Sequence, residues 1–311
     1  MTLGTLYGIG VGPGDPEWMT VKAVRLLSAC RHVCVPKARD LADSIALEIA
    51  RPHLRPDTVV HQTTFLMTLD KALLKQSHAQ AAEEILAILR GGEDCCFLTL
   101  GDPMLYSTYV YLLRELRGIE PRVTVETVPG ITAFSAAAAL TNFPVGEGKQ
   151  PVTIVPASDD FALFRRALDC GGTVVLMKTG KRLQKVLDEL EQRGLIGQAV
   201  FVSHAGQPQQ KIETNLRRLR GGAENLGYLS ILIIQAGPGC DADGDAGILP
   251  ACDADVSSAC DADVSPAPED MGPANASGND KDAGKMFATH AGETPATHEG
   301  GTPSPRTKEL P

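Results

Sequence analysis

Three loops rich in glycine and proline hold the residues best suited to chemistry. The first covers residues 8–16, follows an apolar run and has glycines that would let the backbone approach a ligand closely. The second places Asp102 directly after an apolar run, where its carboxylate could bind a ligand or cap the next helix, and the third centres on Gly130. Because open α/β sheets bind ligands at the carboxyl ends of their parallel strands, three such loops predict a binding site.

The first loop does not match the known nucleotide-binding fingerprints. In the dinucleotide pattern Gly-x-Gly-x-x-Gly, a start at Gly8 puts Pro13 at the third glycine, and a start at Gly10 puts Asp15 there. The sequence contains no Gly-x-x-x-x-Gly-Lys-Ser/Thr motif, which excludes a P-loop. A nicotinamide-dependent oxidoreductase is therefore only a distant alternative, and Lys37 stands where its second strand would end in an acidic residue.

Apolar runs that alternate with helical patterns must position these loops. Thr20 is a typical N-cap, and the spacing of Val21, Val24 and Leu27 predicts a helix with these three residues on one apolar face. Strands that alternate with helices are typical of a parallel α/β sheet. Strands are expected over residues 3–11, 32–36, 58–60, 95–100 and 123–128, and helices after Thr20 and over residues 42–54, 80–90 and 105–116.

A second α/β set follows residue 130, where we place a boundary between two lobes. The expected fold class is thus α/β, with an N-terminal lobe over residues 1–130, a C-terminal lobe over residues 131–239 and a ligand crevice where the lobes meet. In the second lobe, strands are expected over residues 152–155, 173–177, 199–202 and 229–235, and helices over residues 133–140, 161–168 and 183–193.

Charge is distributed unevenly along the chain. The 311 residues include 29 Lys and Arg and 38 Asp and Glu, a formal charge of −9, which argues against a protein that coats nucleic acid or an anionic membrane. Residues 240–311 hold fourteen of the acidic and four of the basic residues, so residues 1–239 carry a charge of +1. No stretch has the pattern of a signal peptide or a membrane span, which predicts a cytoplasmic protein.

Residues 240–311 are expected to be disordered, because small residues and proline dominate them and Phe287 is their one aromatic residue. The segment repeats Cys-Asp-Ala-Asp from Cys240, Cys252 and Cys260. One thiol with two carboxylates is no standard zinc pattern, so no protein-bound metal is expected, and a metal or tetrapyrrole carrier is a minor alternative. The eight cysteines are scattered along a long chain, which indicates free thiols.

Taken together, the loops resemble those of the tetrapyrrole (corrin/porphyrin) methylases. The matching strings are GVGPGDP at 10–16, LTLGDPMLYST at 98–108, VPGIT at 128–132 and FSAAA at 134–138. The second and fourth are similar to those of the C20-methyltransferases that act on precorrin-2 or cobalt-factor II in cobalamin biosynthesis. The resemblance implies an S-adenosylmethionine-dependent enzyme with a parallel N-terminal sheet, a mixed C-terminal sheet and a cleft between them, assembled as a homodimer.

The resemblance also implies where the methyl donor and the acceptor bind. In the family the donor lies between the lobes and is held largely by backbone groups, and Pro13 belongs to a loop on the substrate side. Cations that follow strand-like runs could meet the carboxylates of a tetrapyrrole, and Lys37 and Lys178 are the main candidates, with Arg39 and Lys181 beside them. The implied donor contacts are Leu100, Gly101, Asp102, Leu105, Tyr106, Thr132, Ala133, Met177 and Ala205.

Methyl transfer of this kind demands little of the protein's own side chains. A sulfonium carries its own leaving group and an electron-rich tetrapyrrole carbon is already nucleophilic, so neither an activated serine nor a metal is required. A catalytic base is optional, and Asp102, Tyr106 and His204 are the candidates. Methylation at other ring positions, uroporphyrinogen methylation and diphthine methylation stay open as alternatives, as does the presence of cobalt in the substrate.

Overall fold

The computed structural model describes residues 2–37, 44–65, 70–221 and 229–237, except for the side chains of Lys37 and Lys71. All of these residues belong to one unit, Met1–Ala246. The expected disorder of residues 240–311 concerns residues outside the described part of the chain. Among the described residues, no helix has the length and apolar character needed to cross a membrane, and no three His, Cys, Asp or Glu side chains group as a metal site would need.

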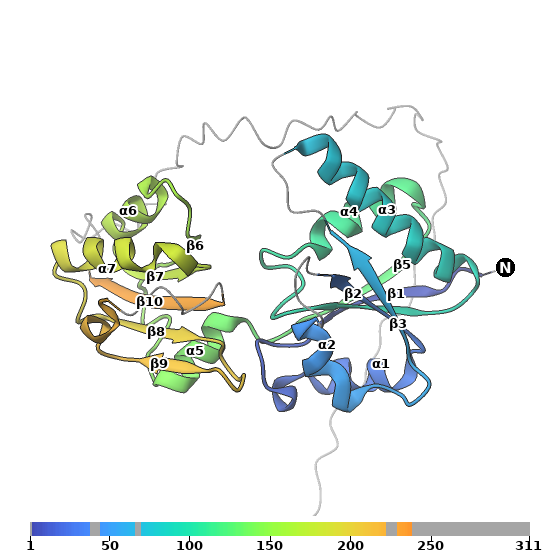
Figure 1. Cartoon of the computed structure of the whole chain (residues 1–311), viewed down its shortest axis with the longest axis horizontal. Coiled ribbons are helices and arrows are strands. Elements are labelled where there is room, and N and C mark those ends of the chain that lie inside the picture. Colours follow the sequence, from blue (N-terminus) through green and yellow to red (C-terminus); the bar gives the residue numbers. More distant parts are fainter. Residues whose placement is uncertain (1, 38–43, 66–69, 222–228, 238–311) are drawn as a thin grey trace, which may run out of the picture. The chain divides into compact units, whose positions relative to one another are not determined.

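The first sheet is parallel throughout, as the alternation of strands and helices predicted. Its strand order is β3-β2-β4-β1-β5, so β4 is the central strand and β1 pairs with both β4 and β5 (Figure 1). Leu6 on β1 pairs with Cys95 on β4, in a register that makes the two strands end together at Gly10 and Thr99. The strands are β1 (Thr5–Gly10), β2 (His32–Lys37), β3 (Val59–Thr64), β4 (Cys95–Thr99) and β5 (Thr124–Val128).

Helices cover both faces of this sheet because alternate residues of its central strands are apolar on each side. On β4, Cys96 and Leu98 pack with the two helices that follow β1 and β2, whereas Cys95 and Phe97 pack with the two helices that flank β4 in sequence (Figure 1). Thr99 is the next residue on the face of Cys95 and Phe97. The helices are α1 (Val21–Ala29) and α2 (Ile45–Ala50) on the first face, and α3 (Lys71–Arg90) and α4 (Tyr109–Ile119) on the second.

The second sheet is mixed, which agrees with the expected fold class. Its order is β6-β7-β10-β8-β9; β6 and β7 are parallel, and β10 runs antiparallel to both β7 and β8. Helices α6 and α7 pack on one face and the alanine-rich α5 on the other. The elements are α5 (Ala133–Thr141), β6 (Val152–Pro156), α6 (Ala162–Asp169), β7 (Gly172–Met177), α7 (Leu183–Gln192), β8 (Ala199–Ser203), β9 (Lys211–Glu213) and β10 (Ser230–Gly237), with short 3-10 helices at Pro16–Trp18, Arg51–His53, Gly180–Arg182 and Leu216–Leu219.

Several element ends differ from the sequence-based expectations. Helix α3 begins nine residues before the expected start because Asp70 caps it, accepting hydrogen bonds from the backbone N–H groups of Ala72 and Leu73. Thr20 caps α1 as expected, accepting a 3.2 Å hydrogen bond from the backbone of Ala23. The expected apolar face of α1 was wrong in part, because Val21 is 87% exposed. Ala23 and Leu27 are the residues of α1 that are buried.

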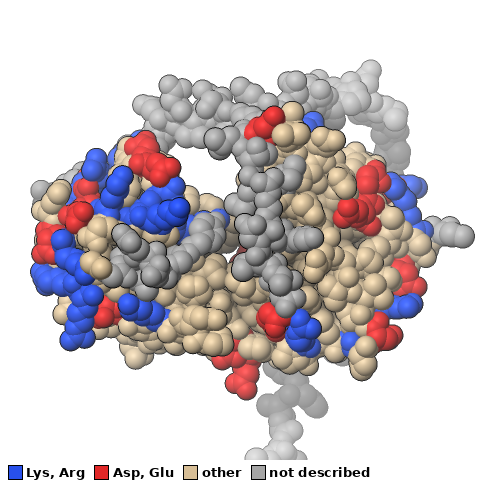
Figure 2. Space-filling model, viewed as in Figure 1, with Lys and Arg blue, Asp and Glu red and all other residues tan. Residues whose placement is uncertain are grey.

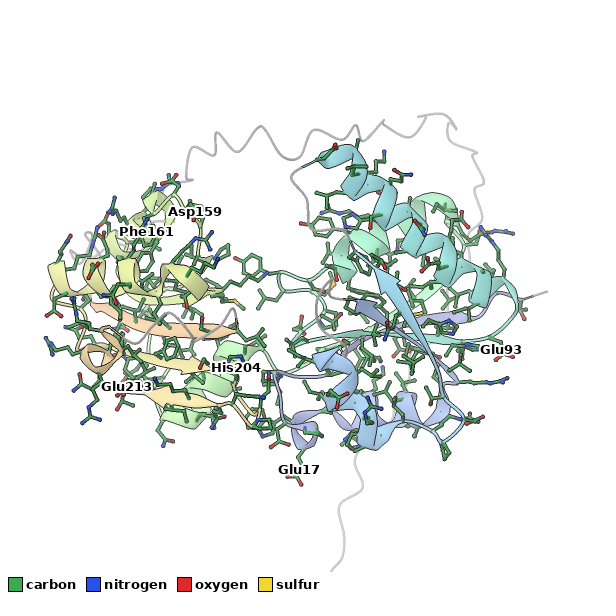
Figure 3. The ribbon with its side chains drawn as sticks, in the orientation of Figure 1. Glu17, Glu93, Asp159, Phe161, His204 and Glu213 are labelled. Atoms are coloured by element: carbon green, nitrogen blue, oxygen red, sulfur yellow. The ribbon has the colours of Figure 1, made fainter. Side chains whose placement is uncertain are left out.

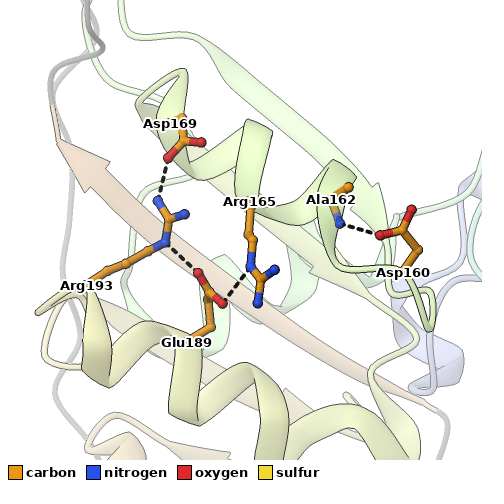
Figure 4. Close-up of polar contacts among 6 residues, drawn as sticks. All are labelled: Asp160, Ala162, Arg165, Asp169, Glu189 and Arg193. Carbon is orange, nitrogen blue, oxygen red and sulfur yellow. Dashed lines mark hydrogen bonds and ion pairs between the residues drawn. The ribbon is translucent and has the colours of Figure 1, made fainter.

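A buried carboxylate joins α6 to α7. Glu189 accepts 2.8 Å hydrogen bonds from Arg165 and Arg193, and Arg193 also donates to Asp169 at 2.5 Å (Figure 4). Burial alone would raise the pKa of Glu189, but the hydrogen bonds from Arg193 and Arg165 outweigh it and hold the pKa below its ordinary value. The carboxylate thus stays charged between two guanidinium groups.

Replacing Glu189 by glutamine is expected to lower the free energy of unfolding at neutral pH by about 1–3 kcal/mol, because charge-assisted hydrogen bonds are lost at a buried site. Since the folded pKa is lowered, the contribution is present above the ordinary pKa of a glutamate and disappears as the pH falls through the lowered value. Urea unfolding at pH 7 measures the loss of unfolding free energy, and urea unfolding at pH 3.5 measures how far that loss diminishes in acid. Glu191→Gln, which removes an exposed carboxylate, is the control and should change stability by at most about 0.5 kcal/mol. Equal losses for the two variants at pH 7 would contradict the prediction.

Candidate active site

The three glycine-rich loops meet backbone to backbone where β1, β4 and β5 end. A Cβ atom on Gly130 would lie 2.1 Å from the carbonyl oxygen of Gly101, and one on Gly10 would lie 2.5 Å from the amide nitrogen of Gly130. Gly12 and Gly101 also exchange backbone hydrogen bonds of 3.2 and 2.8 Å. Side chains at Gly10 or Gly130 would push the loops apart, which explains glycine at these positions.

Asp102 ties the second loop to the third. Its Oδ1 accepts a 2.8 Å hydrogen bond from the backbone N–H of Met104, and its Oδ2 accepts a 3.0 Å hydrogen bond from the backbone N–H of Gly130. Both carboxylate oxygens therefore hold loop backbone. This arrangement favours a positioning role for Asp102 over that of a free catalytic base.

Several contacts join the loops after β1 and β4 to the second lobe. Tyr106 donates its hydroxyl hydrogen to the carbonyl oxygen of Ile154 on β6 at 3.2 Å, and Gln207 donates a side-chain hydrogen bond to the carbonyl oxygen of Pro13 at 2.9 Å. Gly14 also lies close to Ala205, since a Cβ atom on Gly14 would be 2.2 Å from the Ala205 carbonyl oxygen. The loops after β1 and β4 are thus held against strand β6 and the loop that follows β8.

A cavity of about 390 Å³ lies among these loops, within the size range of small-molecule sites. All nine residues that the resemblance assigned to the methyl donor line it, together with Pro13 and Lys178. Leu100, Leu105 and Met177 provide apolar wall, whereas Asp102 is the only acidic residue and Lys178 the only basic residue of the lining among the described residues. The structure therefore brings together predicted residues that are separated by up to 192 positions in the sequence, from Pro13 to Ala205.

Tyr106 and Lys178 form a linked pair at this cavity. Both have left-handed backbone conformations, with φ values of 49° and 61°, which non-glycine residues adopt rarely and often at functional sites. The Lys178 ammonium donates to the carbonyl oxygen of Tyr106 at 3.4 Å and lies 5.8 Å from the centre of its ring. Burial raises the pKa of Tyr106 above its ordinary value, so the phenol keeps its proton at neutral pH and acts as a donor rather than a base.

The remaining predicted site residues lie away from the cavity or outside the described part of the chain. His204 comes directly after β8 and is not part of the cavity lining; its backbone N–H donates to the carbonyl oxygen of Leu229 at 2.8 Å (Figure 3). The side chain of Lys37 and all of Arg39 fall outside the described residues, although Pro36 lines the cavity. Lys181 is exposed.

The lining residues that sequence reasoning missed include two groups from β10 and from the second loop with its strand. The first residues of β10, with Leu229 before them, enter the cavity only because β10 lies between β7 and β8, a neighbourhood that no local pattern indicates. Thr99 and Ser107 line it from the second loop and its strand. Thr99 carried a usable signal, since it is a polar residue at the end of the apolar run on β4.

Comparison with known proteins identifies the fold family. Residues 5–220 match the model of the tetrapyrrole (corrin/porphyrin) methylases. The chain belongs to this family. The resemblance indicated by the loop motifs is thereby confirmed.

The relatives with high coverage carry closely related names. A cobalt-precorrin-2 C20-methyltransferase of Salmonella typhimurium is 32% identical over 74% of this chain and 96% of its own length. A precorrin-2 C20-methyltransferase of Sinorhizobium is 31% identical over 64% of this chain and 83% of its own length. A precorrin-4 C11-methyltransferase of Mycobacterium tuberculosis is 29% identical over 67% of this chain and 79% of its length.

Solved structures support the fold of this methylase. A cobalt precorrin-4 methyltransferase aligns with a TM-score of 0.56 at 24% identity, covering 74% of this chain and 94% of the other. The uroporphyrin-III C-methyltransferase of Thermus thermophilus, solved with S-adenosylhomocysteine, aligns with a TM-score of 0.52 at 23% identity, covering 75% and 97%. These alignments support the α/β fold class expected from the sequence.

Proposed function

We propose that this chain transfers a methyl group from S-adenosylmethionine to carbon 20 of precorrin-2, or of its cobalt-bound form, in cobalamin biosynthesis. The observation that carries the proposal is that all the residues assigned to the donor line one cavity, in a chain of the tetrapyrrole methylase family. The names of the relatives that align over most of their length support carbon 20 as the position.

The cavity fits a sulfonium nucleoside in size and in the chemistry of its lining. Its volume of about 390 Å³ suits a ligand of this size, and glycine backbones at the converging loops leave peptide groups within reach of a ligand. The donor supplies an activated methyl group with its own leaving group. What the chain supplies is alignment in a cavity walled by apolar side chains, and alignment of two reactants accounts for about 7–11 kcal/mol of barrier in favourable cases.

The described residues supply no obvious catalytic base. Both carboxylate oxygens of Asp102 accept hydrogen bonds from loop N–H groups. Burial raises the pKa of Tyr106, so its phenol keeps its proton, and His204 does not line the cavity. We therefore infer that the residues here orient the donor and the acceptor, while the proton of the acceptor carbon leaves to solvent. On this account the rate depends on positioning more than on proton transfer by a side chain.

Lys178 is the residue we assign to a carboxylate of the tetrapyrrole. Figure 2 shows Lys and Arg gathered over the lobe that carries α6 and α7, but the arginines there, such as Arg165, Arg182 and Arg193, pair with acidic side chains. Lys178 holds its ammonium at the cavity beside Tyr106. A cation in that place suits an acceptor with several carboxylates.

Replacing Lys178 by methionine is expected to raise the KM for the acceptor about tenfold while the Kd of S-adenosylhomocysteine stays within about twofold, because a charge-assisted contact is worth about 1.5–3 kcal/mol. Steady-state kinetics and calorimetric titration measure the two quantities. Lys185→Met, on an exposed position of α7, is the matched control and should change neither. An unchanged acceptor KM in Lys178→Met would remove Lys178 from the substrate site.

Acceptor competition tests the proposed substrate against the relatives' alternatives. The protein is incubated with methyl-labelled S-adenosylmethionine and equal amounts of precorrin-2, precorrin-4 and uroporphyrinogen III. Label is expected in the product of precorrin-2. Label in the product of precorrin-4 would contradict the proposed substrate and would favour the activity named for the precorrin-4 C11-methyltransferase relative.

The homodimer, the cytoplasmic location and the division into lobes 1–130 and 131–239 stay predictions beside this function. The two sheets fall on either side of residue 130, which supports that division. Size-exclusion chromatography with light scattering would measure the oligomeric state.

A further inference from the structure

Thr99 has a buried hydroxyl without a partner at the candidate site. The residue ends β4, is 7% exposed and lines the cavity. Its Oγ1 is buried and forms no hydrogen bond with any other described residue. Buried hydroxyl groups are nearly always hydrogen-bonded in native proteins, because an unpaired one loses its interactions with water. A bound ligand is the natural source of the missing partner.

The start of α4 lies on the same face of the sheet as Thr99 and lines the same cavity. Thr99 shares a face of β4 with Phe97, whose ring stacks on that of Tyr109 at 5.9 Å, and Tyr109 is the first residue of α4. Ser107 and Thr108, which lead into the helix, line the same cavity as Thr99. The side chain of Thr108 forms no capping hydrogen bond, so within the first turn of α4 Ser107 holds the N–H of Tyr109 alone.

The groups in this corner of the cavity are hydrogen-bond donors. The first N–H groups of a helix have no carbonyl partner within it and carry partial positive charge, which favours anions. Ser107 already accepts from the backbone N–H of Tyr109 at 3.0 Å, and its own hydroxyl hydrogen is left to donate. The one carboxylate of the lining, that of Asp102, is held by Met104 and Gly130. An anionic acceptor with several lone pairs fits such a corner.

We propose that the Thr99 hydroxyl and the first turn of α4 bind a carboxylate of a bound ligand. The inference rests on the proposed function, in which two ligands carry this group: the methionine portion of the donor and the side chains of the tetrapyrrole. Thr99 is a positioning residue in this account, because a hydrogen bond from its hydroxyl fixes one end of a ligand whose other end reacts.

The test uses three variants of the full chain. Thr99→Val removes the hydroxyl and nearly keeps the shape, and Thr99→Ser keeps the hydroxyl. Thr63→Val is the matched control, because Thr63 is 1% exposed, also has an unpartnered Oγ1 and does not line the cavity. Since each valine removes an unsatisfied buried group, both valine variants are expected to melt at or above the wild-type temperature.

Two probes locate the carboxylate. S-adenosylhomocysteine carries the amino acid portion, and 5′-methylthioadenosine has the nucleoside without it. If the donor's carboxylate binds at Thr99, Thr99→Val weakens S-adenosylhomocysteine about tenfold, leaves 5′-methylthioadenosine unchanged, and Thr99→Ser restores most of the affinity. If the tetrapyrrole's carboxylate binds there, both Kd values stay constant and the acceptor KM rises about tenfold at saturating donor. Thr63→Val changes none of these quantities.

The inference is overturned if Thr99→Val matches the wild type in both Kd values and in the acceptor KM. It is also overturned if the two probes weaken equally, because the hydroxyl would then act on the nucleoside or on the shape of the cavity. Failure of the wild-type chain to bind S-adenosylhomocysteine at all is a different result, which would remove the proposed function and this inference together.

Discussion

Replacing Gly130 by alanine is expected to cause both a large loss of stability and a loss of donor binding. The added Cβ would lie 2.1 Å from the carbonyl oxygen of Gly101 and 2.8 Å from the backbone of Gly10, and neither neighbour is a flexible side chain that could turn away. Overpacking typically costs about 1–3 kcal/mol, and more where backbone must move, so we expect at least about 3 kcal/mol of unfolding free energy to be lost. Separation of the loops should also raise the Kd of S-adenosylhomocysteine at least about tenfold.

Gly118→Ala is the control for this substitution. Gly118 lies in α4, and apart from its chain neighbours and the backbone of its own helix a Cβ there would meet no atom within 4 Å. Alanine should therefore stabilise the helix by up to about 1 kcal/mol. Urea unfolding and calorimetric titration of both variants measure stability and binding. A Gly130→Ala protein with wild-type stability and affinity would show that the loops do not depend on their close backbone contact.

Replacing Asp102 by asparagine is expected to lower kcat/KM at least about a hundredfold. The amide oxygen can accept from one of the two N–H groups, of Met104 or of Gly130, but the amide nitrogen then faces the other as a second donor. Loss of a charge-assisted hydrogen bond and an unpaired N–H group together are worth about 2–4 kcal/mol, which matches this change in rate. The loss should appear in the Kd of S-adenosylhomocysteine as well as in kcat.

This variant also separates two roles for Asp102. A catalytic base would lose kcat while donor affinity stayed unchanged, whereas a loop tie loses affinity too. Asp160→Asn is the matched control, because Asp160 accepts a 2.9 Å hydrogen bond from the backbone of Ala162 at the start of α6 and does not line the cavity (Figure 4). It should leave kcat/KM within about twofold, since asparagine also forms this kind of cap. A hundredfold loss in Asp102→Asn with unchanged donor affinity would restore the catalytic base.

Much of the fold could be predicted because its signals are local. The cap at Thr20 depends only on the residue that precedes the helix. The helix expected over residues 183–193 depends only on the spacing of its apolar residues, and the structure buries Leu183, Val186, Leu187 and Leu190. The start of α3 was missed because Asp70 caps a polar first half that has no clear apolar face. The three-residue strand β9 was missed because it is short and largely exposed, so its pairing with β8 decides its conformation.

The lining of the candidate site could be predicted from motifs, whereas its geometry could not. Gly101, Asp102 and Thr132 belong to recognisable strings, so the resemblance to a family was enough to assign them to the donor. The partners of Asp102, and the open hydroxyl of Thr99, depend on how distant strands end side by side. Those contacts arise from tertiary packing between distant segments, and the spacing of residues along the sequence does not predict them.

A single-turnover experiment tests the central claim of methyl transfer to carbon 20. Excess protein is mixed with methyl-labelled S-adenosylmethionine and precorrin-2, with and without cobalt in the macrocycle, and nuclear magnetic resonance identifies the carbon that carries the label. We predict label at carbon 20 of one of the two acceptors, and the dependence on cobalt then assigns the natural substrate. Label at any other carbon, or no transfer to either acceptor by protein that binds S-adenosylhomocysteine, would contradict the account.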